Sequence, residues 1–154
     1  MADPGADLPA LDEHAVDIAA PPVAVWPALL AAVDGAFAGP VASTYARLIR
    51  CADPSSGGPR PLEEGSTIVG FRVAAAVPER ELELVGHHVF STYRLRLVLA
   101  PTPGGTLVRA ETRARFPGLH GRLYRAAVVS TGAHVASVRR LLASIQRHAE
   151  TAAD

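Results

Sequence analysis

The sequence predicts an α+β domain in which a curved antiparallel sheet wraps around a long C-terminal helix. The first observation is a series of short segments with alternating apolar and polar residues, separated by turn-forming residues. The second is a helical pattern of apolar residues that follows Phe116-Pro117-Gly118 and runs almost to the C-terminus. Consecutive strands joined by short turns form an antiparallel meander with one solvated face, so the helix is expected to cover the other face.

The composition indicates one globular domain with an interior of small side chains. A chain of 154 residues has the length of a single domain, and 49% hydrophobic residues supply an ordinary core. Aromatic residues make up only 5%, so Ala, Val and Leu line much of the interior. Small lining residues favour a cavity between sheet and helix.

Charge and cysteine content exclude several classes of function. The formal net charge of +0 argues against nucleic-acid binding, which depends on clustered cations. Cys51 is the single cysteine, so no intramolecular disulfide forms. The N-terminus has no signal-peptide pattern, and no apolar run reaches membrane-spanning length. We therefore expect a cytoplasmic protein without stable membrane insertion, as a monomer or homodimer.

The first part of the chain is expected to contain a flexible tail, a strand and a helix. Residues 1–13 are predicted as the tail and residues 14–152 as the single domain. Alternation over His14–Ala19 predicts a strand, and apolar spacing over Val23–Val33 predicts a helix. Pro27 is expected to kink or delay this helix.

Alternation predicts the remaining strands of the meander. The turns fall at Pro78-Glu79, Gly86-His87 and Pro103-Gly104-Gly105. The predicted strands are Thr44–Arg50, Thr67–Val77, Glu81–Val85, Phe90–Leu99 and Thr106–Phe116.

The C-terminal helix has one apolar face with a weak point near its middle. The residues on this face recur at spacings of three and four. They are Tyr124, Ala127, Thr131, His134, Val138, Leu141 and Ile145. The run Val128–Gly132 combines β-branched residues with glycine, each unfavourable in a helix. We expect the helix to be weakest or bent there.

Several segments resemble one known superfamily. They are His14–Trp26 with its Pro21-Pro22-x-x-Val25-Trp26 helix start, Glu64–Arg72, Glu81–Gly86 and the terminal helix. Together they resemble the START-like, or helix-grip (SRPBCC), superfamily, nearest to its polyketide cyclase/dehydrase and lipid-transport branch. The resemblance implies a helix-grip fold that holds an apolar or amphipathic ligand between the sheet and the last helix. Some such proteins catalyse cyclisation or dehydration at that position.

The candidate ligand-binding residues face the space between the sheet and the helix. They are Phe71, His88, Tyr93, Thr112, Tyr124, Thr131 and His134. Buried polar groups need partners, so the alternative is that these polar groups, with Ser91, hydrogen-bond to one another in a closed core. His88 faces inward if it continues the strand Glu81–Val85, and outward if it belongs to the next strand. Arg47 has the same two possibilities, with solvent the safer one because a buried Arg needs a partner.

Three functional hypotheses follow. The leading one is a binder or carrier of a small hydrophobic or amphipathic molecule. The second is a polyketide cyclase or dehydratase, with His134 and Tyr93 as catalytic acid/base candidates. The third is a stress- or toxin-type module that acts through a protein partner. Histidine spacing gives no metal site, and no Gly-rich dinucleotide or phosphate loop appears, so we expect no metal and no cofactor.

Overall fold

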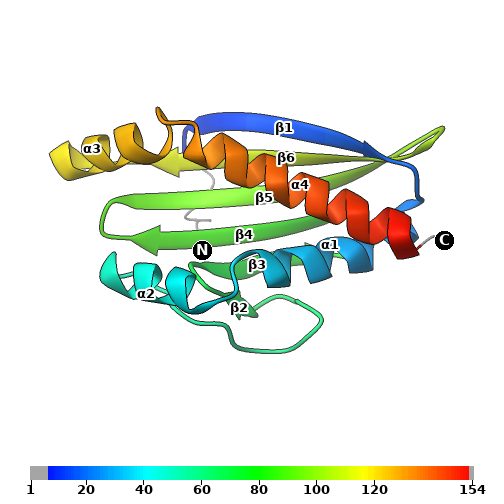
Figure 1. The fold of residues 1–154 in the computed structure, drawn as a ribbon, viewed down its shortest axis with the longest axis horizontal. Coiled ribbons are helices and arrows are strands. Elements are labelled where there is room, and N and C mark those ends of the chain that lie inside the picture. The colour runs from blue at the N-terminus through cyan, green and yellow to red at the C-terminus, as the bar shows by residue number, and fades with distance from the viewer. Residues whose placement is uncertain (1–6, 153–154) are drawn as a thin grey trace.

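The protein was analysed as a computed structural model that describes residues 7–152. Its strands form a six-stranded sheet in the order β1-β6-β5-β4-β3-β2, and every neighbouring pair is antiparallel (Figure 1). The strands are β1 Ala10–Ile18, β2 Thr67–Ile68, β3 Phe71–Val77, β4 Glu81–His88, β5 Ser91–Thr102 and β6 Gly105–Arg115. The helices are α1 Pro22–Ala36, α2 Pro40–Leu48, α3 Gly118–Val128 and α4 Ala133–Ala152. The predicted α+β architecture is confirmed.

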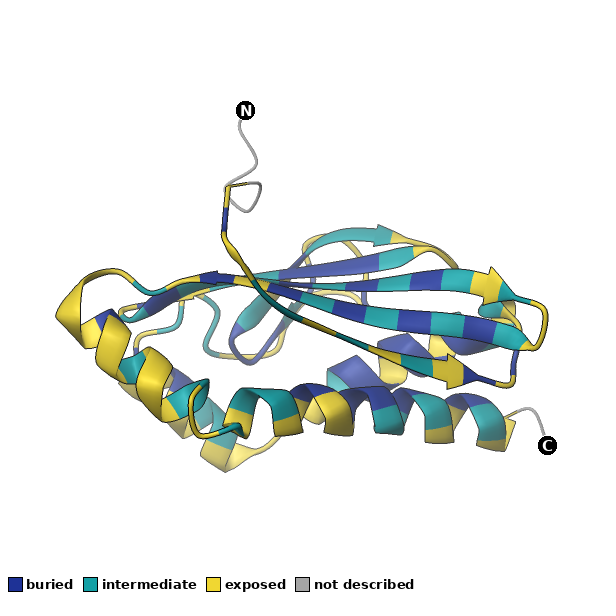
Figure 2. Cartoon of the chain, turned by 90° about the horizontal axis from the view of Figure 1, so that it is seen from above, coloured by how far each residue is buried: buried dark blue, intermediate teal, exposed yellow. Residues whose placement is uncertain are grey.

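The four helices lie on one face of the curved sheet, and α4 crosses it obliquely (Figures 1 and 2). The other face is polar: Arg94 pairs there with Glu83, and Arg96 lies between Glu81 and Glu111. Opposite charges on neighbouring strands, directly across or diagonal to each other, stabilise an antiparallel sheet. One face therefore meets water and the other receives the helices.

The helices cover the sheet unevenly. In what we call the closed half, α1 and the segment Val138–Ala149 of α4 pack against each other and the sheet. Fully buried side chains from α1, from α4 and from the sheet meet there. They include Leu29, Val33, Leu82, Leu97, Val108 and Ile145. In what we call the open half, α2, α3 and the first turn of α4 stand over the other end of the sheet, and α3 is largely exposed (Figure 2).

The strand predicted at Thr44–Arg50 is wrong, because this segment belongs to α2. Pro40 begins the helix, where its missing N–H removes no hydrogen bond. Ala42, Ala46 and Ile49 then recur at helical spacing and face the sheet. The predicted window was too short to separate this period from an alternation of two.

The single strand predicted at Thr67–Val77 is also wrong, because the chain reverses inside it. Ile68 pairs with Phe71, so Val69 and Gly70 form a tight hairpin between β2 and β3. Gly70 has φ +86°, a left-handed conformation that favours glycine. The apolar residues concealed this turn, since none of the neighbours of Gly70 is a usual turn former.

The turn predicted at Gly86-His87 lies instead at Val89-Phe90, and β4 continues to His88. Gly86 has a packing role. A Cβ at this position would lie 2.2 Å from the ring of its cross-strand partner Tyr93. The glycine therefore allows the Tyr93 ring to lie across β4.

The start of β1, the start of α1 and the break near Gly132 can each be compared with the prediction. β1 begins at Ala10, so residues 10–13 of the predicted tail belong to the sheet, whereas residues 1–6 lie outside the described part. Pro27 does not delay α1, which begins at Pro22. The weak point predicted near Gly132 is confirmed as a break between α3 and α4, where Gly132 has φ +79°.

Within residues 7–152, no single helix is long and apolar enough to cross a membrane. Helices α1 and α2 together have sufficient length and apolar composition, but they are bent by 68° relative to each other. The apolar side chains of α1 are buried in the closed half.

Candidate functional site

The open half contains a cavity of about 400 Å³ between the sheet and helices α2, α3 and α4. Most of its wall is apolar. Its apolar lining residues include Phe37, Ile49, Val69, Phe71, Leu95 and Leu141. Small-molecule sites in proteins commonly have volumes of roughly 300–1,000 Å³, so this cavity falls within the usual range.

Small side chains from β6, α2 and α4 line part of the cavity. Along β6 the inward residues are Val108 and Ala110 beneath the closed half, then Thr112 and Ala114 beneath the cavity. Ala42 and Ala46 of α2 and Ala133 of α4 also face this volume. No long aliphatic side chain from β6 or α2 therefore reaches across it.

A pair of tyrosines joins the two helices that cover the cavity. Tyr45 of α2 donates a hydrogen bond to the hydroxyl oxygen of Tyr124 of α3, with the oxygens 2.9 Å apart. Tyr124 also stacks on Phe90, with ring centroids 5.2 Å apart. Burial, followed by the hydrogen bond from Tyr45, raises the pKa of Tyr124, so its phenol stays neutral. The pair closes one side of the cavity.

Tyr93 forms part of the cavity wall, but its proton is already engaged. Its hydroxyl donates to the carbonyl oxygen of Gly70 at 2.5 Å. Burial, and then the neighbouring Cys51, raises the pKa of Tyr93. The Cys51 thiol also lines the cavity, and burial raises its pKa as well. Both groups are therefore neutral at pH 7.

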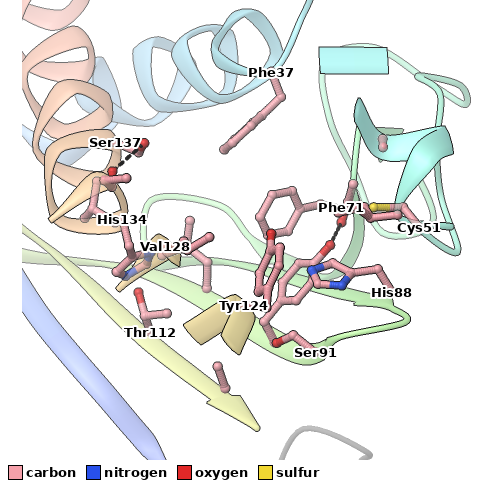
Figure 3. Close-up of a pocket in the computed structure, with 18 of the residues that line it drawn as sticks. Phe37, Cys51, Phe71, His88, Ser91, Thr112, Tyr124, Val128, His134 and Ser137 are labelled. Atoms are coloured by element: carbon pink, nitrogen blue, oxygen red, sulfur yellow. Dashed lines mark hydrogen bonds between the residues drawn. The ribbon is translucent and has the colours of Figure 1, made fainter. Parts of the chain in front are cut away.

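His88 lies on β4 and faces the cavity, so the inward alternative is correct (Figure 3). It is 4% exposed, and its Nδ1 accepts a hydrogen bond from the backbone N–H of Phe90 at 3.1 Å. Burial, and then the nearby His87, lowers the pKa of His88 to about 4. The imidazole is neutral at pH 7 and acts as a hydrogen-bond acceptor.

The end of the cavity beneath α4 is polar (Figure 3). His134 Nε2 lies 3.2 Å from the Asp12 carboxylate, and His14 Nε2 lies 3.4 Å from the same carboxylate. Thr112 is the cross-strand partner of Asp12 and is 6% exposed. Among the described residues, the Thr112 hydroxyl has no hydrogen-bond partner. The cavity therefore has a long apolar part and one polar end.

The structure brings most of the predicted ligand-binding residues to this cavity. Those at its wall are Phe71, His88, Tyr93, Thr112, Tyr124 and His134. Thr131 is a correction: it lies in the break between α3 and α4, is exposed, and donates to the carbonyl of Ala127. The break rotates α3 relative to α4, so the continuous helical face used for the prediction does not exist. Arg47 is exposed on α2 and does not line the cavity, which agrees with the solvent alternative.

The residues of the site that sequence reasoning missed include Asp12, Tyr45 and Cys51. Asp12 fell in the predicted tail, although Asp12, His14, Val16 and Ile18 continue one alternating pattern. Extending that pattern towards the N-terminus would have placed Asp12 on the inner face. Tyr45 was assigned to a strand, which concealed its position over the cavity.

No family model matches the sequence, and no curated protein matches it. Among solved structures, an uncharacterised protein from Rhizobium leguminosarum has a TM-score of 0.59 at 14% identity, covering 94% of this chain and 96% of that chain. Ara h 8.0201 has a TM-score of 0.53 at 9% identity, covering 91% and 97%. Protein Ms6760 from Mycobacterium smegmatis has a TM-score of 0.53 at 10% identity, covering 90% and 96%.

At these identities the likeness concerns the arrangement of elements along nearly the whole chain, and it agrees with the sheet order and terminal helices described above. The fold implied by the resemblance of the sequence is confirmed. The chain has the helix-grip fold.

Proposed function

We propose that the protein binds a small hydrophobic or amphipathic molecule in the cavity of its open half. The observation that carries this proposal is the volume of about 400 Å³ with a mostly apolar wall. Water gains few hydrogen bonds in such a space, so an apolar molecule that replaces it is favoured by the hydrophobic effect. The neutral state of His88, Tyr93 and Tyr124 adds to this, because no charge at these positions opposes an apolar occupant.

The proposal is tested with the purified protein and two variants. Native mass spectrometry is expected to show a co-purified molecule, and a panel of lipids and aromatic ketones is expected to raise the melting temperature. A ligand at one hundred times its dissociation constant stabilises the folded state by about 2.7 kcal/mol. Ala114→Leu extends a side chain into the cavity and should remove both signals.

Leu123→Ala is the matched control, because Leu123 is 61% exposed and does not line the cavity. It should retain both signals. The proposal would be contradicted if native mass spectrometry showed only the protein without ligand and no compound of the panel raised the melting temperature. It would also be contradicted if Ala114→Leu bound ligand as well as the unchanged protein does.

A second candidate function is acid–base catalysis of the cyclase or dehydratase type. The observation that favours it is the pairing of His134 with Asp12 at the polar end of the cavity. A carboxylate that orients an imidazole is a common arrangement for a general base. Here His134 would remove a proton next to a ketone, and the Thr112 hydroxyl would donate to the developing enolate oxygen.

This candidate assigns no proton transfer to Tyr93, because the Tyr93 hydroxyl donates to Gly70. His134→Ala should abolish product formation from an aromatic polyketone while retaining ligand binding, whereas Tyr93→Phe should retain most of the activity. Equal product formation by the protein and by His134→Ala would remove the enzymatic candidate and leave the binding proposal intact.

A further inference from the structure

The polar end of the cavity contains hydrogen-bonding groups that the described protein atoms do not satisfy. Thr112 is 94% buried, since its exposure is 6%, yet its hydroxyl has no partner among residues 7–152. Buried polar groups in native proteins are nearly always hydrogen-bonded, and an exception indicates an absent partner such as a ligand or water. Thr112 is one of the residues that line the cavity, and its hydroxyl oxygen points towards His134, so the missing partner is expected between these two side chains (Figure 3).

Backbone pairing explains why this hydroxyl lies beside an acid and two imidazoles. Asp12 and Thr112 face each other across β1 and β6, after a register shift between Ala10 and Asp12. His14 follows two residues later on the same face of β1, and His134 comes from the first turn of α4. His134 and Thr112 lie next to each other at the same end of the cavity (Figure 3).

The contact between His134 and Asp12 determines which ring nitrogen remains available. A carboxylate only accepts hydrogen bonds, so the Nε2 of His134 is the donor in its 3.2 Å contact with Asp12. In a neutral imidazole the other nitrogen, Nδ1, then carries no proton and is an acceptor. The described residues supply no donor to this Nδ1.

The polar end therefore offers one acceptor, His134 Nδ1, and one group that both donates and accepts, the Thr112 hydroxyl. A hydroxyl group on a ligand satisfies both, because it donates to the imidazole and accepts from the threonine. A ketone or ether oxygen only accepts, so it leaves Nδ1 without a partner. A carboxylate has no proton to donate and is repelled by Asp12.

We infer that the cavity selects a neutral hydroxylated ligand, an alcohol or phenol, whose hydroxyl group lies between Thr112 and His134. The apolar body of the ligand then extends along the wall formed by Phe71, Val69 and Phe37. This inference rests on the proposed ligand binding and specifies the chemical class of the ligand.

The experiment compares three compounds of one shape: 2-naphthol, 2-methoxynaphthalene and 2-naphthoic acid. Their affinities for the full-length protein are measured by isothermal titration calorimetry at constant pH and salt. The phenol is expected to bind roughly threefold to tenfold more tightly than the ether, which is the range that one hydrogen bond commonly supplies. The acid is expected to bind most weakly.

Thr112→Val identifies the group responsible. Valine has nearly the shape of threonine without the hydroxyl, and it removes an unsatisfied buried polar atom, so the variant is expected to fold. It should weaken the binding of the phenol and of the ether alike, because each accepts a hydrogen bond from Thr112, and the phenol should stay the tighter ligand, because it still donates to His134 Nδ1. Thr102→Val is the matched control, because Thr102 lies on β5 outside the cavity lining, so the same substitution there should leave both affinities unchanged.

The possible outcomes separate this inference from the proposed function. Binding of all three compounds without preference, or an unchanged affinity of Thr112→Val for the phenol, would overturn the hydroxyl assignment while leaving ligand binding in place. Tightest binding of the acid would do the same. No binding of any of the three, with no other compound of the thermal-shift panel bound, would overturn both.

Discussion

The closed and open halves share the same sheet and the same helix α4, yet only one of them is filled. In the closed half, α1 and α4 bury large aliphatic side chains, and Leu29, Leu97 and Ile145 are each 0% exposed. In the open half, α2 and α3 leave a cavity of about 400 Å³ and carry exposed apolar residues, with Leu48 79% and Leu119 69% exposed. The closed half therefore supplies most of the buried core, and the open half leaves the space in which we propose that a ligand binds.

The largest expected effect tests whether the stability of the fold depends on the closed half. Leu97→Ala removes a fully buried side chain and leaves a void, so it should lower the free energy of unfolding by about 2–5 kcal/mol. Leu123→Ala, on the exposed side of α3, should change it by less than about 0.5 kcal/mol. Urea unfolding followed by circular dichroism measures both, and equal losses would contradict the comparison.

The next effect compares two alanines on the same face of β6. Ala110 is 0% exposed in the closed half, so Ala110→Leu overpacks the core and should cost about 1–3 kcal/mol of folding free energy. Ala114 lines the cavity, where a leucine has room, so Ala114→Leu should cost clearly less. The same urea experiment measures the difference. A larger loss for Ala114→Leu would mean that the open half is packed as tightly as the closed half.

A smaller effect is expected at the break between α3 and α4. Gly132 has φ +79°, and a Cβ there would meet nothing within 4 Å, so Gly132→Ala introduces only backbone strain of about 1 kcal/mol. Gly35→Ala is the control. A Cβ at Gly35 also meets nothing within 4 Å, but its backbone is helical, so the substitution should stabilise by about 0.4–1 kcal/mol. Thermal unfolding should therefore show a lower melting temperature for Gly132→Ala and a higher one for Gly35→Ala. A higher melting temperature for Gly132→Ala would contradict a strained backbone at the break.

The smallest effect at neutral pH is expected from the titration of His88. Its pKa is about 4 in the folded protein and 6.5 ordinarily, so between these values the unfolded chain binds more protons. The contribution of His88 to the free energy of unfolding is therefore constant above pH 6.5 and falls as the pH decreases from 6.5 towards 4. His88→Asn keeps an acceptor for the N–H of Phe90 and removes the titration.

Urea unfolding at a series of pH values measures the slope of stability for both proteins. Between pH 6.5 and 4 the free energy of unfolding is expected to fall less steeply in His88→Asn than in the unchanged protein, whatever the stability of the variant at pH 7. Identical slopes would show that His88 titrates normally in the folded protein.

Much of the fold could be predicted from the sequence because alternation directly reports which residues face the core. The strand predicted at Thr106–Phe116 was found because a period of two is maintained along it, and Val108, Ala110, Thr112 and Ala114 are all buried. The assignment of Thr44–Arg50 failed because seven residues do not separate a helical period from alternation. The hairpin at Gly70 and the position of Gly86 depend on the backbone conformation and on the Tyr93 ring, which no local pattern reports.

The candidate site could be predicted only in part. Thr112, Tyr124 and His134 were found because each lies within a regular element whose inner face the pattern identifies. Asp12 was missed because the sequence around it is short, polar and close to the N-terminus. Its partners His134 and Thr112 are a hundred or more positions away, so only the pairing of β1 with β6 and the crossing of α4 bring these groups together.

The sequence by itself determined the antiparallel meander, the covering C-terminal helix and its break near Gly132, because these depend on periodicity and on the backbone preferences of glycine and proline. Only the tertiary structure decided that α2 and α3 leave space above Thr112 and Ala114, and that Asp12 orients His134 at one end of that space. A cavity is the difference between the distance separating the layers and the size of the side chains between them. That distance depends on contacts between residues distant in the sequence, such as those of α1 with α4 in the closed half.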